Sequence, residues 1–353
     1  MDLTKRIDRV LKVLERTGAD ALLVAKPVNI RYLTGLRLDG SKVIIGRKKC
    51  RIITSFLYKE TAKAAPAKYR LTVQDSDGEE EVLAKIIKDD GIKNLAFENS
   101  MSFNAAVTLR KRCRGIHTQP ACGIVESVRA LKEENEIRKI RHAVRITKAA
   151  FETAKKKLNT KSRESELVNL IKREFLRMGG DGPAFEPIVA GQPSACQPHY
   201  FSKAKKIGIN NSVLIDMGAN FRGYNSDLTR VVSLGRISSK FKYIYSVVRD
   251  AQKSALESLR PGIKACKVDN KARKYIEKKG FGRYFGHALG HGVGLEIHEK
   301  PVISGKSKDV LKPGMVFTIE PGIYIPGFGG VRIEDMILVK KGGYEVITDD
   351  IDK

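Results

Sequence analysis

The chain of 353 residues is poor in cysteine, with five scattered along it and none in a CxxC pair. An odd number of dispersed cysteines argues against a disulfide framework and a thiolate zinc site, and suits a reducing compartment. No apolar run approaches the roughly 18–20 residues that span a bilayer. The charged N-terminus MDLTKRIDRVLKVLERTG lacks the features of a signal peptide and has the spacing of an amphipathic helix. We therefore expect a cytoplasmic protein without a membrane segment.

The formal net charge is high, at +26, from 66 Lys and Arg against 40 Asp and Glu. The excess is spread along the chain, and its densest clusters, GRKKCR (46–51) and LRKRCR (109–114), have no aromatic neighbour. A dedicated nucleic-acid surface is more typically a concentrated basic stripe with interleaved aromatics. We interpret the charge mainly as solvated basic faces. A nucleic-acid or other polyanionic partner is not favoured, although the charge leaves it open.

The order of patterns along the chain predicts two domains. Up to about residue 120, short apolar runs such as ADALLVAK and KNLAFE alternate with helical spacing, as in EEEVLAKIIKDDG. A long amphipathic helical stripe follows, then a helix near 162–178, and then a region rich in strands and glycine. There is no internal repeat or low-complexity segment. We expect an α/β (α+β) protein with domains at 1–124 and 125–353.

Carboxylates in apolar strands are the first chemical signal. In NSVLIDMGANFRGYNSDLTRVV (211–232), an apolar strand ends on Asp216, a glycine-containing turn follows, and a second strand carries Asp227. A carboxylate in such a setting is costly unless a cation neutralises it. For either aspartate alone, a turn or capping role is the alternative.

Two later segments repeat this arrangement. The strand-like GMVFTIEPGIYI (314–325) leads into Glu320, and GGVRIEDMILVK (329–340) reads as one strand with Glu334 embedded in it. A single buried glutamate is more often half of a salt bridge than a metal ligand. Arg332, two residues earlier and so on the same strand face, is the candidate partner of Glu334.

The stretch GHALGHGVGLEIHE (286–299) lies between these pairs of acids and holds His287, His291 and His298. It is not a zincin motif, because no glutamate follows its first histidine and its glycines suit a helix poorly. Four carboxylates converging in one core would repel one another strongly. Two divalent cations would turn that repulsion into binding energy. A mostly hard-oxygen ligand set favours Mn²⁺, Co²⁺ or Fe²⁺ over a structural zinc.

These motifs, in this order, resemble the pita-bread metallopeptidases, a family that includes methionine aminopeptidase, aminopeptidase P, prolidase and creatinase. The spacings of eleven between the aspartates and fourteen between the glutamates also fit. NIRYLTGL (29–36) resembles the N-terminal domain of the prolidase, aminopeptidase P and creatinase branch. The resemblance implies a small N-terminal α/β domain, followed by a pita-bread domain with a curved antiparallel sheet. It implies five metal ligands: Asp216, Asp227, His291, Glu320 and Glu334.

The same resemblance implies how these ligands act. Asp216 would bind one ion, His291 and Glu320 the other, and Asp227 and Glu334 would bridge both. A metal-bridged hydroxide would attack the peptide carbonyl, with Glu320 as general base and then as proton donor to the leaving amine. Mn²⁺ or Co²⁺ are the expected ions, with Zn²⁺ or Fe²⁺ as alternatives.

The remaining site residues also follow from the resemblance. His199, in CQPHY, and His298 match positions that donate hydrogen bonds to the tetrahedral intermediate. The loop before His199 departs from the Gly/Asn/Ser-rich form usual in the family. His287 is either a substrate-entry or supporting residue or a structural one. Phe185 is either a wall for a proline ring or a core residue, and Arg332 is a candidate for binding the substrate carboxylate.

We therefore expect a peptidase that cleaves before a proline in the second position of a small peptide. An Xaa-Pro dipeptidase (prolidase) is preferred, and an Xaa-Pro aminopeptidase acting on longer peptides is the alternative. From another class, a non-catalytic polyanion-binding scaffold would have no need of an intact ligand set, and a creatinase-like amidinohydrolase would not need the metal ligands. The resemblance also implies a homodimer.

Overall fold

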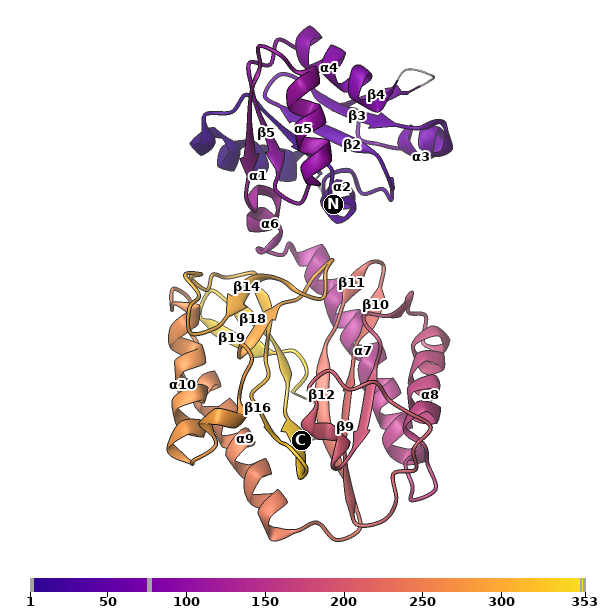
Figure 1. The fold of residues 1–353 in the computed structure, drawn as a ribbon, viewed down its shortest axis with the longest axis vertical. Coiled ribbons are helices and arrows are strands. Elements are labelled where there is room, and N and C mark those ends of the chain that lie inside the picture. The colour runs from indigo at the N-terminus through magenta and orange to yellow at the C-terminus, as the bar shows by residue number, and fades with distance from the viewer. Residues whose placement is uncertain (1–2, 75–77, 350, 352–353) are drawn as a thin grey trace. The chain divides into compact units, whose positions relative to one another are not determined.

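The computed structural model describes residues 3–74, 78–349 and 351. The chain divides into two compact units, Met1–Arg129 and Ala130–Lys353, whereas the sequence analysis placed the domain boundary after residue 124. The predicted mixed α/β class is confirmed, with a small N-terminal unit and a larger C-terminal one (Figure 1). No helix in the described parts of the chain is long and apolar enough to cross a membrane.

The N-terminal unit is built on a six-stranded sheet with the order β4-β3-β2-β1-β5-β6. Strand β1 pairs antiparallel with β2 and parallel with β5, so the sheet is mixed. The first helix continues into a short 3-10 turn and ends at Gly18, which takes the left-handed conformation that glycine allows. The helices and strands of the N-terminal unit are α1 Leu3–Leu14, β1 Ala21–Val24, α2 Pro27–Thr34, β2 Lys42–Gly46, β3 Cys50–Thr54, α3 Lys59–Ala62, β4 Tyr69–Val73, α4 Glu79–Asp89, β5 Asn94–Glu98, α5 Phe103–Arg112, β6 His117–Ala121 and α6 Ile124–Arg129.

The motif NIRYLTGL has a structural role within this unit. The Asn29 amide donates to Glu98 Oε1 at 2.5 Å and to Glu126 Oε1 at 2.8 Å. Its carbonyl oxygen accepts from Arg129 Nη1 at 2.6 Å. Burial raises the pKa of Glu98, against the hydrogen bonds that it accepts. One asparagine therefore connects α2, β5 and α6 through side chains that satisfy one another.

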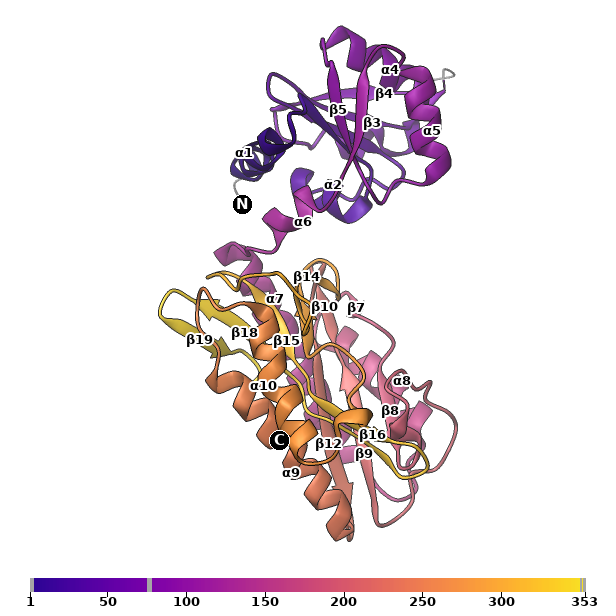
Figure 2. The ribbon, with the colours of Figure 1, turned by 60° about the vertical axis from the view of Figure 1, so that its left-hand side comes forward.

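The C-terminal unit consists of two halves, each with a helix pair packed on antiparallel strands. In Figures 1 and 2 its strands run between the α7–α8 pair and the α9–α10 pair. One apolar core packs α7 and α8 against β8, β9 and β12, and another packs α9 and α10 against β15 to β18. The first half comprises α7 Glu134–Lys157, α8 Glu164–Arg177, β7 Gly182–Pro183, β8 Ile188–Gly191, β9 Asn211–Met217, β10 Ala219–Phe221, β11 Tyr224–Asn225 and β12 Leu228–Leu234. The second comprises α9 Ser239–Glu257, α10 Ala265–Lys278, β13 Gly290–Gly292, β14 Glu299–Ile303, β15 Val316–Ile319, β16 Gly322–Ile325, β17 Gly329–Arg332, β18 Asp335–Lys340 and β19 Gly343–Val346.

The segment 329–340 differs from the single strand predicted from its sequence. Strand β17 ends at Arg332 and pairs with β16, whereas β18 begins at Asp335 and pairs with β15. Between them, the Ile333 amide donates to Pro321 O and the Glu334 amide donates to Thr229 O. The chain thus leaves one sheet and enters another, and Glu334 lies in the break. Hydrophobic alternation alone could not reveal this change of partner.

Candidate metal centre

The two aspartates come from neighbouring strands of the first half. Asp216 lies in β9 directly opposite Thr229 of β12, and Asp227 immediately precedes β12. The antiparallel ladder therefore brings the two carboxylates to one end of the same strand pair. Both are buried, with 8% of Asp216 and 4% of Asp227 exposed, so each carboxylate needs compensating charge or hydrogen bonds.

The second half supplies the imidazole and the two glutamates. His291 is the middle residue of the short strand β13, and Glu320 follows the last residue of β15. Thr318, on the same face of β15 as Glu320, donates to Glu320 Oε1 at 2.9 Å and accepts from the His291 amide at 3.1 Å. One hydroxyl thus fixes the relative positions of the two side chains.

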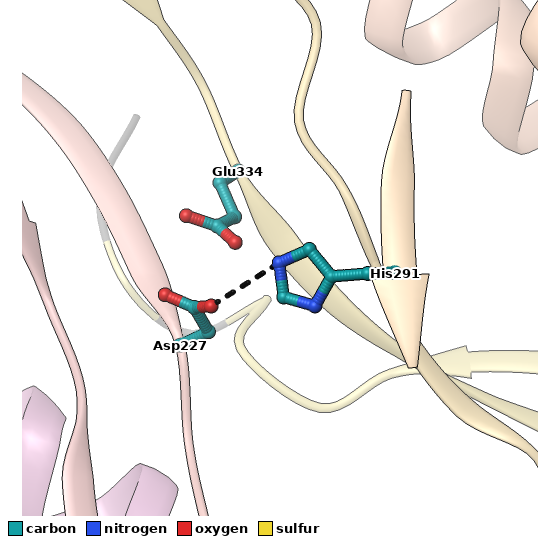
Figure 3. A group of neighbouring side chains, drawn as sticks. All are labelled: Asp227, His291 and Glu334. Atoms are coloured by element: carbon teal, nitrogen blue, oxygen red, sulfur yellow. Dashed lines mark ion pairs between the residues drawn. The ribbon is translucent and has the colours of Figure 1, made fainter. Parts of the chain in front are cut away.

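The five side chains converge between the halves. His291 Nε2 lies 3.2 Å from Glu320 Oε1 and 3.6 Å from Asp227 Oδ2. Asp227, His291 and Glu334 each offer one ligand atom within 4.8 Å of the others (Figure 3). In Figure 3 the carboxylates of Asp227 and Glu334 and the ring of His291 all point toward the same small space.

The electrostatics of this cluster call for cations. Burial first, and then neighbouring carboxylates, raise the pKa of Asp227 and Glu334 well above their ordinary values. Burial also raises the pKa of Asp216. Asp216 Oδ1 and Glu334 Oε1 are buried and accept no hydrogen bond from the residues that the structure describes. Orphaned carboxylate oxygens are costly, and divalent ions held by these residues would satisfy them. The donor set therefore fits divalent metal.

Glu320 behaves differently from the other acids. Burial by itself would raise its pKa, but the hydrogen bond and charge of His291 outweigh burial and lower the pKa to about 2. Burial likewise opposes the charged imidazole, yet Glu320 raises the pKa of His291. His291 thus compensates the negative charge of Glu320 directly, and it also lies within ion-pair distance of Asp227.

Arg332 compensates charge on the other side of the cluster. Its Nη2 donates to Asp216 Oδ2 at 2.5 Å, its Nε to Thr229 Oγ1 at 3.0 Å, and its Nη1 to Tyr324 Oη at 2.8 Å. Thr229 in turn donates to Glu334 Oε2 at 2.6 Å. From the sequence, Arg332 was the candidate partner of Glu334. In the structure its ion pair is with Asp216, because β17 ends before Glu334 and the two side chains do not share a strand face.

All the residues assigned to the site from the sequence line one cavity of about 460 Å³. The rings of His298 and His291 meet edge to face with centroids 4.2 Å apart. His199 is exposed within the lining, and the loop that carries it is tied to the buried Glu164, which accepts from the Tyr200 hydroxyl at 2.9 Å. The cavity lining includes Asp216, Asp227, His291, Glu320, Glu334, His199, His298, His287, Arg332 and Phe185.

Both ring nitrogens of His287 are engaged inside the protein. Nδ1 lies 2.8 Å from Ala288 O, so it carries the proton, and Nε2 lies 3.1 Å from Tyr324 Oη. Burial lowers the pKa of His287. This geometry fits a residue that shapes the cavity wall better than one that donates a hydrogen bond to a substrate.

Sequence reasoning missed the hydroxyls that hold the ligands in place: Thr229, Thr318 and Tyr324. Two of them carried a signal. Thr318 is two residues before Glu320, which places both on one face of a strand, and Thr229 is two residues after Asp227. Tyr324 carried no such signal, because its partners lie on β17 and in the segment before β13.

The fold and the cluster together define a metal-dependent peptidase with the pita-bread architecture. Residues 138–341 match the family model described as metallopeptidase family M24, and residues 6–131 match that of the creatinase/prolidase N-terminal domain. The chain belongs to metallopeptidase family M24.

Named relatives resemble the chain over nearly its whole length. It is 35% identical over 347 residues to an Xaa-Pro dipeptidase of Pyrococcus horikoshii, covering 98% of this chain and 97% of the relative. The solved Xaa-Pro dipeptidase from Bacillus anthracis has 34% identity and a TM-score of 0.95, covering 99% of both chains. The X-Pro aminopeptidase from Thermotoga maritima has 31% identity and a TM-score of 0.86, covering 96% of this chain and 97% of that one.

Proposed function

We propose that this metallopeptidase is an Xaa-Pro dipeptidase that works with two divalent ions, with Mn²⁺ or Co²⁺ preferred. The observation that carries the proposal is that four carboxylates and one imidazole line the same cavity. Two of the carboxylate oxygens, Asp216 Oδ1 and Glu334 Oε1, are buried without a hydrogen-bond donor among the described residues. The names of the relatives from P. horikoshii and B. anthracis support the substrate class.

The ligand roles are proposed residue by residue. Asp216 would hold one ion, His291 and Glu320 the other, and Asp227 and Glu334 would contact both. Bound ions would acidify a water and polarise the substrate carbonyl. Hydrogen bonds from Thr318 and Thr229 hold Glu320 and Glu334 in place before any ion arrives, which is the supporting arrangement that metal sites require.

The other side chains would handle the substrate. Glu320 would take the proton of the attacking water and return it to the leaving nitrogen. His298 and His199 would donate to the carbonyl oxygen as it gains negative charge, a contribution that often amounts to several kcal/mol. Phe185, in the cavity lining, would pack against the proline ring. The proline nitrogen has no N–H, so recognition has to rest on shape here.

An Xaa-Pro aminopeptidase is the second candidate, and one observation favours it. Among the described residues that line the cavity, Arg332 is the one Lys or Arg, and each of its three nitrogens already donates a hydrogen bond, to Asp216, Thr229 or Tyr324. A dipeptide presents a free carboxylate that needs a donor near the proline, whereas a longer peptide does not. The likeness to the T. maritima X-Pro aminopeptidase also supports this alternative.

Hydrolysis of Ala-Pro and of Ala-Pro-Ala by the Mn²⁺- or Co²⁺-loaded protein tests the proposal. We expect cleavage of Ala-Pro alone. Cleavage of both peptides would instead establish the aminopeptidase, and cleavage of neither by correctly folded, metal-loaded protein would contradict both. An Asp227→Asn preparation assayed in parallel controls for contaminating peptidases.

We further propose that the enzyme is a cytoplasmic homodimer. All five cysteines are free thiols, which suits a reducing compartment. The dimer rests on the family resemblance alone, and sedimentation equilibrium of the purified chain tests it directly. A single species at 39.2 kDa, the mass of one chain, would contradict it.

A further inference from the structure

A second cavity of the C-terminal unit runs along α7 and reaches Ile347. It has a volume of about 410 Å³ and shares no lining residue with the catalytic cavity. Among the described residues that line it, every polar side chain is a cation, and the others are aliphatic. The lining consists of Arg138, Arg141, Val144, Arg145, Lys148 and Ile347, and we name it the α7 groove.

The four cations of the α7 groove form a row on one helix face. They are spaced three, four and three residues apart, so each is a surface neighbour of the next. At a rise of 1.5 Å per residue, the row from Arg138 to Lys148 extends about 15 Å along the helix. Like charges at such spacing destabilise a helix, and a bound anion would remove that cost.

Two of these cations are held in position by other elements. Both carboxylate oxygens of Glu345, on β19, accept from the guanidinium of Arg141, one of them at 2.9 Å. Arg145 Nη2 lies 2.8 Å from His142 Nδ1. Since a guanidinium can only donate, the His142 nitrogen is the acceptor.

The partner of Arg145 is itself fixed. The ring of His142 stacks on Phe221 with centroids 3.9 Å apart and an interplanar angle of 19°. Burial and the nearby charge of Arg145 lower the pKa of His142, which keeps the ring neutral and able to accept. The groove is therefore partly ordered in advance, which reduces the entropy cost of binding an anion.

We propose that the α7 groove binds a linear chain of phosphate groups, as found in inorganic polyphosphate or in the backbone of a single-stranded nucleic acid. A row of about 15 Å exceeds one phosphate and suits several in succession. The described lining holds no aromatic ring on which bases could stack, so recognition depends on charge and not on base sequence. Arginine, which supplies three of the four cations, is well suited to phosphate oxygens.

Fluorescence polarisation with a labelled oligothymidylate tests this inference. We expect the holoenzyme to bind the oligothymidylate. A plot of the logarithm of the association constant against the logarithm of the salt concentration should have a slope of about −0.7 per phosphate contact, or roughly −3 for four contacts. The double variant Arg138→Gln/Arg145→Gln should lose on the order of tenfold in affinity near 0.1 M salt, and its slope should fall by about 1.4.

A matched control removes the same charge elsewhere. Lys271 and Lys274 are exposed cations on α10, so Lys271→Gln/Lys274→Gln lowers the net charge equally and leaves the α7 groove intact. We expect the control to keep the wild-type affinity and slope, and both variants to keep the wild-type melting temperature and peptidase activity. Equal weakening in the two double variants would show attraction by net charge alone and would overturn the proposal, as would an absence of binding.

Competition identifies the source of the phosphate chain. Long-chain inorganic polyphosphate should displace the oligothymidylate, and orthophosphate at the same total phosphate concentration should not. Whichever of polyphosphate and oligothymidylate binds with the lower Kd per phosphate is the better candidate for the natural ligand. Failure of polyphosphate to compete would mean that sugars or bases are recognised, and would contradict a site for phosphate chains.

Discussion

Glu334 and Asp335 are consecutive carboxylates that point to opposite sides of the chain. Glu334 accepts from Thr229 and faces the metal-ligand cluster. Asp335 is fully buried in the other direction, where its Oδ1 accepts from Arg230 Nη2 at 2.7 Å. The alternation of an extended backbone thus directs the first carboxylate toward the candidate metal centre and the second toward Arg230.

The two acids should therefore respond differently to amide substitution. Asp335→Asn leaves the buried Arg230 without its anion and should lower the free energy of unfolding by about 3–5 kcal/mol. Glu334→Gln should abolish activity and weaken metal binding with little loss of stability in the metal-free protein. Urea denaturation of metal-free samples, with activity measured on the loaded ones, separates the two. Comparable destabilisation by both would refute this division of roles.

Removing Asp227, which we propose as a ligand of both ions, should abolish most of the stabilisation that bound metal gives the protein. In the wild type, divalent ion at about 100 times its Kd should add about 2.7 kcal/mol to the free energy of unfolding. Asp227→Asn removes a buried carboxylate whose ionisation is already unfavourable, so the metal-free variant should be at least as stable as wild type. Its metal-dependent gain should largely vanish, and kcat/KM should fall on the order of a thousandfold. Thermal unfolding with and without Mn²⁺ measures this, and an undiminished gain would count against Asp227 as a ligand.

Arg332→Lys should be a damaging exchange despite the conserved charge. The guanidinium bonds three different side chains at once, and an ammonium cannot reproduce that planar geometry. We expect metal affinity to fall about 10–100-fold, as for other residues that support ligands. Titration calorimetry with Mn²⁺ provides the measurement. Arg177→Lys, at a residue whose side chain is 64% exposed, is the control and should match wild type.

Acid should remove the stability contributed by Glu345. The hydrogen bond from Arg141, supported by that from Lys340, lowers the pKa of Glu345 to about 2 against the opposing effect of burial. A lowered pKa means that the contribution is complete above the unfolded value of about 4.3 and is lost as the pH falls toward 2. Because these ion pairs are partly solvated, Glu345→Gln should cost only about 1 kcal/mol at pH 7.

Denaturation curves of wild type and Glu345→Gln at pH 7, 5 and 3 follow this difference. The gap between the two proteins should be similar at pH 7 and 5 and smaller at pH 3. A gap that widens in acid would mean that Glu345 is not stabilised as an anion.

Much of the fold was predictable because the signals were local. The amphipathic N-terminal helix, the strands within ADALLVAK and KNLAFE, and the helix within EEEVLAKIIKDDG are confirmed. The order and flanks of the carboxylates identified the family, which the family models confirm. The roles assigned to individual site residues stay predictions, although the structure brings those residues into one cavity.

What the sequence could not reveal depends on partners distant in the chain. The ion pair of Arg332 crosses 116 positions to reach Asp216, and no local pattern distinguishes that partner from the nearer Glu334. The break between β17 and β18 separates two strands that pair in different sheets, β17 with β16 and β18 with β15. The pre-positioning of Arg145 depends on the stacking of His142 on Phe221, from another element. Such contacts follow from register and packing, which single-residue patterns do not encode.

The division of the ligands between the two halves of the C-terminal unit has a consequence for biosynthesis. A nascent chain that has emerged through β12 carries both aspartates, but its histidine and glutamates are still unmade. On the proposed ligand assignment, high-affinity metal capture would have to wait until the break before β18 has left the ribosome and the segment from α9 to β17 has folded. An ion held by these residues would thus bind as one of the last events of folding and would link the first half of the unit to the second.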